Sequence, residues 1–246
     1  MYTFTRKLAG LTAGAALVAA QGAAAGSATV DAGNGNSVTF EYNDTMLRIN
    51  NSIDANSYAV MRDGTMFTVA IAEGMPIVMD AGAMMKSMGN MPGMEAINLP
   101  TDAGDLDGRV VSLKDTGRDE TVAGIMGDLY ELTVEDDSGQ QRTETLVLST
   151  DKRVLEFRDA MLLMVDMTAS ISPQQGMDEA REQGKELEAR LRGLNAGVLR
   201  IGDQMSVTAI TDDAIPDARF ELPAKPMDLQ GFGSMLGEMQ KRMQER

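Results

Sequence analysis

The stretch that decides the fold runs from Ser57 to Met94. It begins Ser57-Tyr-Ala-Val-Met-Arg62, Asp63-Gly64, Thr65-Met-Phe-Thr-Val-Ala-Ile71 and continues with Met75-Pro-Ile-Val-Met-Asp80. Asp-Gly between two apolar-rich runs predicts a β-hairpin, because a type I′ turn needs positive φ at both central residues. The third run then predicts a further strand beside this hairpin.

A methionine-dense segment follows these strands. Its first part, Ala81 to Met88, predicts a short helix, because Gly89, Pro92 and Gly93 prevent a longer one. Methionine is a flexible, polarisable side chain that fills irregular apolar space. The segment contains Met84, Met85, Met88, Met91 and Met94.

The N-terminus has the pattern of a secretory signal peptide. Arg6 and Lys7 precede a short apolar run, and Ala23-Ala24-Ala25 is a small-residue cleavage site. We expect residues 1–25 to be removed and the protein to be periplasmic or secreted. A membrane anchor is the alternative, but a bilayer span needs about 20 predominantly apolar residues and this run is shorter. We therefore expect no stable membrane span after cleavage.

Composition narrows the function classes further. Removal of residues 1–25 takes away two of the 22 basic residues and none of the 37 acidic ones, which leaves a net charge of −17. This charge disfavours binding to nucleic acid and to anionic membranes. Cysteine, histidine and tryptophan are absent, so disulfides cannot stabilise the fold. We expect a hydrophobic core or a bound ligand to supply the stability, and we expect no cofactor.

The rest of the chain predicts a single α+β domain. We expect residues 26–36 to be a flexible start, 37–226 the domain, and 227–246 an amphipathic C-terminal helix. Between 109 and 148 we expect four separate strands: 109–114, 120–126, 128–134 and 142–148. Helices are expected over 154–167 and from Ser172 to about Asn195, with a last short strand over Arg219–Leu222.

Four short motifs, in this order, resemble an uncharacterised family of exported bacterial proteins. They are Arg62-Asp-Gly64-Thr-Met-Phe; Thr121-Val-Ala-Gly124 with Tyr130; Thr150-Asp-Lys-Arg-Val154 with Phe157; and Phe220-Glu-Leu-Pro223-Ala. Lys225 stands where that family has glycine. The family is similar in fold to the periplasmic lipoprotein carriers. The resemblance implies a strongly curved, unclosed antiparallel β-barrel covered on its concave face by helices, and it carries no known activity.

The leading functional expectation is a non-enzymatic periplasmic protein that binds a lipid-like or other apolar ligand in a half-open barrel. Methionine-rich elements would cover the apolar inner face. The residues expected to form this lid are Met75, Met79, Met84, Met85, Met88, Phe157, Met161 and Met164.

Two alternatives remain open. Thioethers are soft ligands that select Cu(I), so Met84, Met85, Met88, Met91 and Met94 are candidate ligands of a Cu(I) or Ag(I) site. Methionines elsewhere in predicted strands, such as Met46, favour packing instead. The other alternative is a structural or interaction module of the cell envelope, whose protein partners the sequence does not name.

Two catalytic or metal-binding patterns are incomplete. Asp102, Asp105 and Asp107 precede Gly108, but a calcium loop in this register would have Lys114 where its bidentate glutamate belongs. Ser149-Thr-Asp-Lys152 matches the S-x-x-K string of serine hydrolases without the partner strings of that class. We therefore expect no enzymatic activity.

Overall fold

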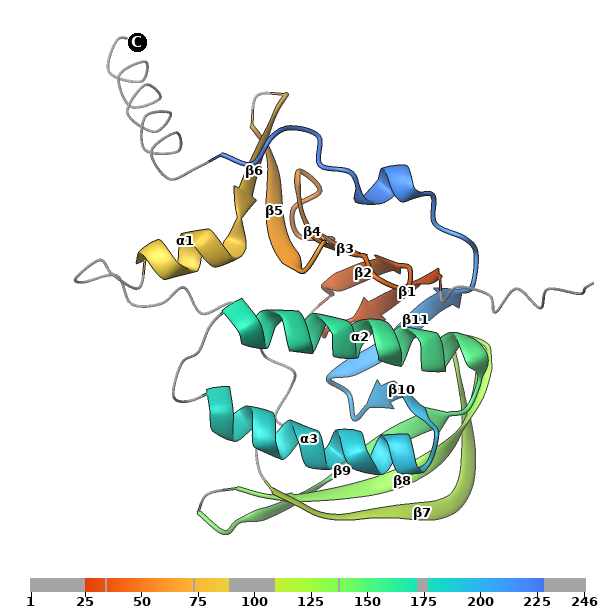
Figure 1. The fold of residues 1–246 in the computed structure, drawn as a ribbon. Helices are drawn as coiled ribbons and strands as arrows, with labels where there is room; N and C mark the ends of the chain where they lie inside the picture. The colour runs from red at the N-terminus through yellow and green to blue at the C-terminus, as the bar shows by residue number, and fades with distance from the viewer. Residues whose placement is uncertain are drawn as a thin grey trace, which may run out of the picture.

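The computed structural model describes residues 25–33, 35–72, 74–88, 109–136, 138–171 and 177–227, with side chains left undescribed for 85–88, 167–171 and 177–184. Within these ranges the chain forms eleven strands, three α-helices and a 3₁₀ helix, η1 (Figure 1). The first strands are β1 (Gly26–Asp31), β2 (Ser37–Tyr42), β3 (Leu47–Asn51), β4 (Ser57–Arg62), β5 (Thr65–Ala72) and β6 (Met75–Asp80), followed by α1 (Ala81–Met88). The later elements are β7 (Arg109–Val122), β8 (Ile125–Glu135), β9 (Gln141–Ser149), α2 (Lys152–Ile171), α3 (Met177–Gly193), β10 (Gly197–Ile201), β11 (Met205–Thr211) and η1 (Asp217–Phe220).

All eleven strands belong to one antiparallel sheet of order β6-β5-β4-β3-β2-β1-β11-β10-β9-β8-β7. Pairing of β1 with β11 brings the first and last strands together in the middle of the sheet. The edges are β6 and β7, which do not pair with one another, so the sheet is not closed. The predicted antiparallel sheet is confirmed, and its open order fits an unclosed β-barrel.

The half of the sheet from β11 to β7 curls strongly. Cα atoms of β7 come within 8 Å of β11, although β10, β9 and β8 lie between them, and four strand spacings of a flat sheet would be about 19 Å. Gly127 permits close approach inside this curl, because a Cβ there would lie 2.7 Å from the Leu148 carbonyl oxygen.

Two apolar clusters form the core on opposite sides of β8. Ile125 and Leu129 belong to one cluster, together with Val154, Phe157 and Ala160 of α2. Leu132 and Val134 belong to the other, against which Leu187 and Leu191 of α3 pack. Odd- and even-numbered residues of a strand point to opposite faces. The two helices therefore pack against opposite faces of this part of the sheet.

A third set of buried side chains lies on β4, β5 and β6, on the face of the sheet that Met61 does not occupy. Val60, Val69 and Val78 are at most 1% exposed, and Phe220 of η1 is fully buried. Two arginines fasten η1 to the sheet: Arg48 donates to the Arg219 carbonyl and Arg62 to the Phe220 carbonyl. Beyond η1, Met227 N donates to the Val78 carbonyl at the β6 edge.

Several local predictions need correction. Residues 26–31, expected to be flexible, form the central strand β1, in which Ala28 is 1% exposed. The expected strand over 120–126 is instead divided by a turn at Ala123-Gly124, where both φ angles are positive (51° and 76°). The expected strand over 219–222 is wrong, because the chain there forms η1.

Candidate functional site

The candidate site is a row of cross-strand partners on one face of β2 to β6. In the register of the sheet Phe40 lies opposite Ile49, Ile49 opposite Ala59, Ala59 opposite Thr68, and Thr68 opposite Met79. Directly opposed residues of neighbouring strands project from the same face. We call these five residues the apolar row.

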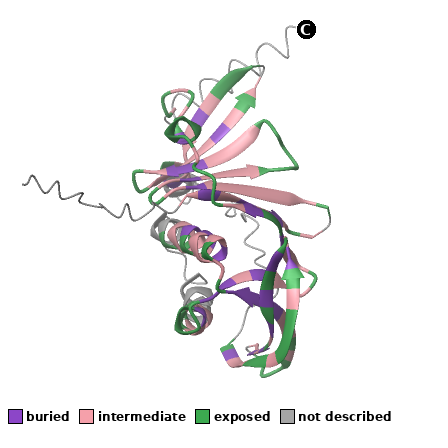
Figure 2. Cartoon of the chain, turned by 90° about the vertical axis from the view of Figure 1, so that its right-hand side faces the viewer, coloured by how far each residue is buried: buried purple, intermediate pink, exposed green. Residues whose placement is uncertain are grey.

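Along this line of cross-strand partners, burial is greatest in the middle of the sheet. Ile210 of β11 and Ala28 of β1 extend the apolar row in the other direction and are 7% and 1% exposed. All five members of the row are only half-buried. Figure 2 shows the same trend, since the upper strands are mostly pink and green while the strands near the helices carry most of the purple segments.

Helix α2 covers the buried end of the apolar row. The Phe157 ring lies 5.5 Å from the ring of Phe40 and 6.1 Å from that of Tyr42, between centroids. One and two turns further along, Met161 and Met164 are half-buried against the same cluster. Aromatic contacts of this kind stabilise the fold beyond the burial of apolar area. The first half of α2 is therefore held against β2 by the Phe157 ring.

Helix α1 lies at the other end of the row, where it contacts β5, β6 and α2 (Figure 1). The Asp80 side chain accepts a hydrogen bond from Ala83 N at 2.9 Å, which caps the helix at its start. This cap fixes where β6 ends and α1 begins. Met84 of α1 is half-buried.

The predicted lid residues have different positions. Phe157 is 5% exposed and part of the core. Met79 is a half-buried member of the apolar row, Met161 and Met164 are half-buried against the same cluster as Phe40, and Met84 is half-buried on α1. Met75 is 61% exposed next to the β5–β6 turn, so it does not contribute to a lid. The side chains of Met85 and Met88 lie outside the described residues.

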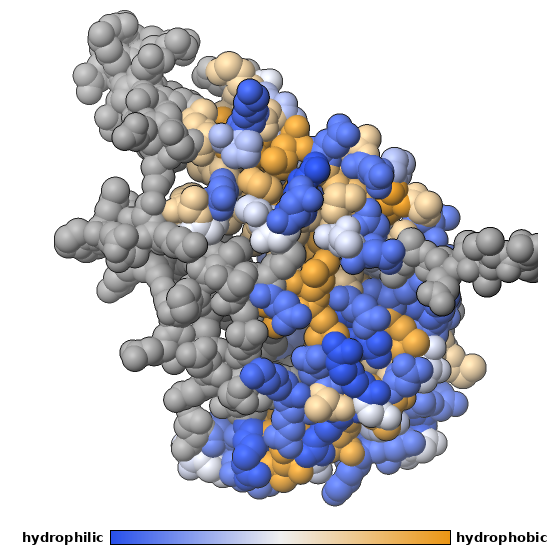
Figure 3. Space-filling view, in the orientation of Figure 1, coloured by the Kyte–Doolittle hydropathy of each residue, from blue (hydrophilic) through white to orange (hydrophobic). Residues whose placement is uncertain are grey.

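Sequence reasoning missed Phe40, Ile49, Ala59 and Thr68. The strand runs that contain them were recognised, but which residues share a face across five strands depends on the register of each pair. Figure 3 shows apolar residues among polar ones over the upper part of the molecule, and a mostly hydrophilic surface below, over α3 and β7 to β9.

The chemistry of this site is apolar. The apolar row contains no titratable group, and thioether and aliphatic side chains surround it. Among the described residues no group of three or more Asp, Glu, His or Cys side chains could hold a metal ion. Of the five methionines proposed as Cu(I) ligands, Met84 alone has a described side chain. The Asp102–Asp107 loop lies outside the described residues.

The S-x-x-K residues have structural contacts. The Ser149 hydroxyl donates to the Met126 carbonyl at 2.9 Å, and the Lys152 ammonium lies 3.1 Å from Glu156 Oε1. A hollow of about 240 Å³ beside the β8–β9 turn is lined by Asp136, Gln140 and Arg142. Neither feature adjoins the apolar row.

Comparisons with models of known families, with curated proteins and with solved structures find no match. The resemblance to lipoprotein carriers therefore stays a prediction.

No helix in the described ranges combines the length and the hydropathy that crossing a membrane requires.

Proposed function

We propose that this is an exported, non-enzymatic protein that binds a lipid-like or other apolar ligand on the concave face of an unclosed barrel, with α1 and α2 covering that face. The observation that carries the proposal is the apolar row. It continues the hydrophobic core across five strands while remaining half-exposed. The row crosses five strands, and the four spacings between them add up to about 19 Å. This length suits an extended hydrocarbon chain.

The energetics support this choice. Burial of apolar surface contributes about 25 cal/mol per Å², or about 0.8 kcal/mol for each methylene group. Eight methylenes laid along the row would gain about 6 kcal/mol before the costs of association. Half-buried methionines at the border of the row, such as Met161 and Met164, adapt to ligands of different shape because their side chains are flexible.

Filling the row with bulky side chains tests the proposal. We expect Ala59→Trp and Thr68→Trp to weaken binding of a fluorescent fatty acid by about tenfold or more, since each indole takes the volume the chain would occupy. Thr208→Trp is the matched control, because Thr208 is exposed on β11, and it should bind as the wild type does. Wild-type protein that does not bind the probe, or equal affinity in all variants, would contradict the proposal.

A further inference from the structure

Two polar atoms without hydrogen-bond partners lie near the start of β1. The Tyr42 hydroxyl and Glu156 Oε2 are both buried and have no partner among the described residues. Tyr42 as a whole is 1% exposed and the Glu156 side chain 11%. A buried polar atom left unpaired costs about 1–3 kcal/mol. Two of them together indicate a partner that the described residues do not supply.

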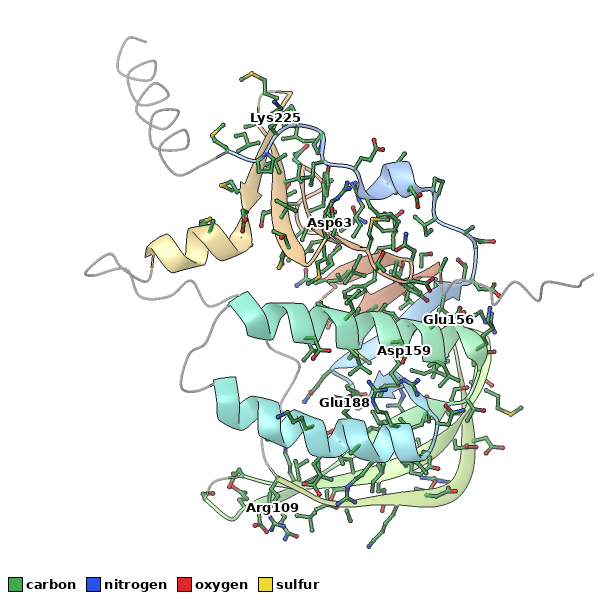
Figure 4. All side chains as sticks on the ribbon, in the orientation of Figure 1. Asp63, Arg109, Glu156, Asp159, Glu188 and Lys225 are labelled. Atoms are coloured by element: carbon green, nitrogen blue, oxygen red, sulfur yellow. The ribbon has the colours of Figure 1, made fainter. Side chains whose placement is uncertain are left out.

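Helix α2, which carries Glu156, contacts the strand that begins at Gly26. Burial raises the pKa of the Tyr42 hydroxyl, and the negative charges of Glu156 and Asp212 raise it further. Glu156 lies in the second turn of α2 (Figure 4), a helix that contacts both β1 and β11. Asp212 directly follows β11. The start of β1, the end of β11 and the beginning of α2 therefore converge on one polar group of atoms.

Gly26 is the backbone member of this group. It lies opposite Tyr42 in the β1–β2 register, and a Cβ built on it would be 3.1 Å from the Tyr42 hydroxyl oxygen. A backbone nitrogen is about 2.5 Å from the Cβ of its own residue, so Gly26 N is within about 6 Å of that hydroxyl.

The charged side chains that pair with or act on these groups carry a net negative charge. Lys152 pairs with the other oxygen of Glu156, and Arg153 pairs with Asp151. Asp212 adds a third acidic group, and its charge also acts on Arg153. Three acidic and two basic side chains leave one excess negative charge, which a single cation would neutralise.

We propose that Tyr42 and Glu156 form a receptor for the α-ammonium group that export processing creates at Gly26. Hydrolysis of the Ala25–Gly26 peptide bond by a signal endopeptidase and one water leaves a carboxylate on Ala25 and a protonated amine on Gly26. The protonated amine has three N–H donors. It can donate one hydrogen bond to the Tyr42 oxygen and another to Glu156 Oε2. In the uncleaved chain the same nitrogen is a neutral amide with one N–H.

The receptor requires cleavage at Ala25–Gly26 but no bound apolar ligand. Its consequence is that the mature chain is more stable than its precursor, because an ion pair replaces two unpaired buried atoms. Processing and completion of the fold are then coupled.

Three forms of the mature chain test the receptor: one with a free amine at Gly26, the same chain acetylated there, and one that begins at Ala25. The first should melt roughly 2–4 °C above the other two, the shift typical of one lost interaction in a domain of this size. Glu156→Gln should remove most of that difference. Glu188→Gln, which changes a surface pair with Arg192 on α3, should leave it intact.

Equal melting temperatures of the three forms, or a difference that persists in Glu156→Gln, would overturn the proposal. A second measurement needs no variant. The Gly26 amine should react with an amine-acylating reagent at least about tenfold more slowly in the folded protein than in denaturant, and equal rates would overturn the proposal as well. The proposal would also be overturned if the exported protein began at a residue other than Gly26.

Discussion

Arg200 of β10 and Glu120 of β7 form an ion pair with two hydrogen bonds, of 2.9 and 2.7 Å, across the intervening strands β9 and β8. Three strand spacings of a flat sheet amount to about 14 Å. The Arg200 guanidinium also donates to the Gly202 carbonyl at 2.7 Å. The pair therefore joins the edge strand β7 to β10 across the curl of the sheet.

We expect Glu120→Gln to lower the free energy of unfolding by about 1–2 kcal/mol. Charge-assisted hydrogen bonds contribute more than neutral ones, but the Glu120 side chain is 38% exposed and solvent screening reduces its contribution. Urea denaturation measures the change. Glu135→Gln is the control, because Glu135 pairs with Arg109, which is 65% exposed. This substitution should lower the free energy of unfolding by less than Glu120→Gln does. Equal effects of the two substitutions would mean that the cross-sheet pair has no special role.

The hairpin turn at Asp63-Gly64 provides a second prediction. Both residues have positive φ, 51° and 71°, as a type I′ turn requires. Gly64→Val should destabilise the domain by about 1–3 kcal/mol through backbone strain alone, since a Cβ at Gly64 meets no atom within 4 Å. Gly193→Ala, also in open space but without positive φ, should be nearly neutral. Thermal unfolding of Gly64→Val within error of wild type would contradict the strain argument.

Local signals in the sequence were sufficient to predict the β4–β5 hairpin and helix α1. Asp63-Gly64 specifies its own turn, and Asp80 caps the helix that the following residues form. The β7–β8 turn was missed because Ala123 adopts positive φ without the side chain that favours it. Strand β1 was missed because its place in the middle of the sheet depends on pairing with β11, which is about 180 residues away in sequence.

The candidate site could be predicted only in part. Half-buried Met79, Met161 and Met164 were identified from methionine content, but Phe40 and Ile49 join them only through the register of the sheet. Tyr42 and Glu156 are each ordinary in sequence. Their shared burial without partners arises from the contact of α2 with β1, which no local pattern encodes.

Asp151 predicts a dependence of stability on pH. It accepts hydrogen bonds from Arg153 N, at the start of α2, and from the Arg153 guanidinium, and the side-chain bond is the main reason its pKa is lowered. A carboxylate with a lowered folded-state pKa stabilises the fold above its unfolded pKa and loses that contribution as pH falls through the folded one. Asp151→Ala should therefore lower the melting temperature at pH 7, and this difference should shrink below about pH 4. A difference that stays constant with pH would rule out the charge as its source.

The last prediction separates the two uses of the methionine segment. If Met84, Met85, Met88, Met91 and Met94 pack against apolar surface, replacing all five by Leu nearly conserves volume and hydrophobicity, and each such change typically costs less than about 1.5 kcal/mol. Fatty-acid probe binding should then survive within about tenfold, and neither protein should take Cu(I) from a chromogenic chelator under anaerobic conditions.

If the five thioethers instead ligate Cu(I), the wild type would compete with the chelator in a fixed stoichiometry and the Leu variant would not, because all five soft donors of the segment are gone. Met46→Leu is the control for loss of a thioether elsewhere in the chain. We expect the apolar outcome, because Met161 and Met164 are half-buried against the hydrophobic cluster that contains Phe157, and Met79 of the apolar row is half-buried as well. A tight Cu(I) site that the Leu variant abolishes would reverse this assignment.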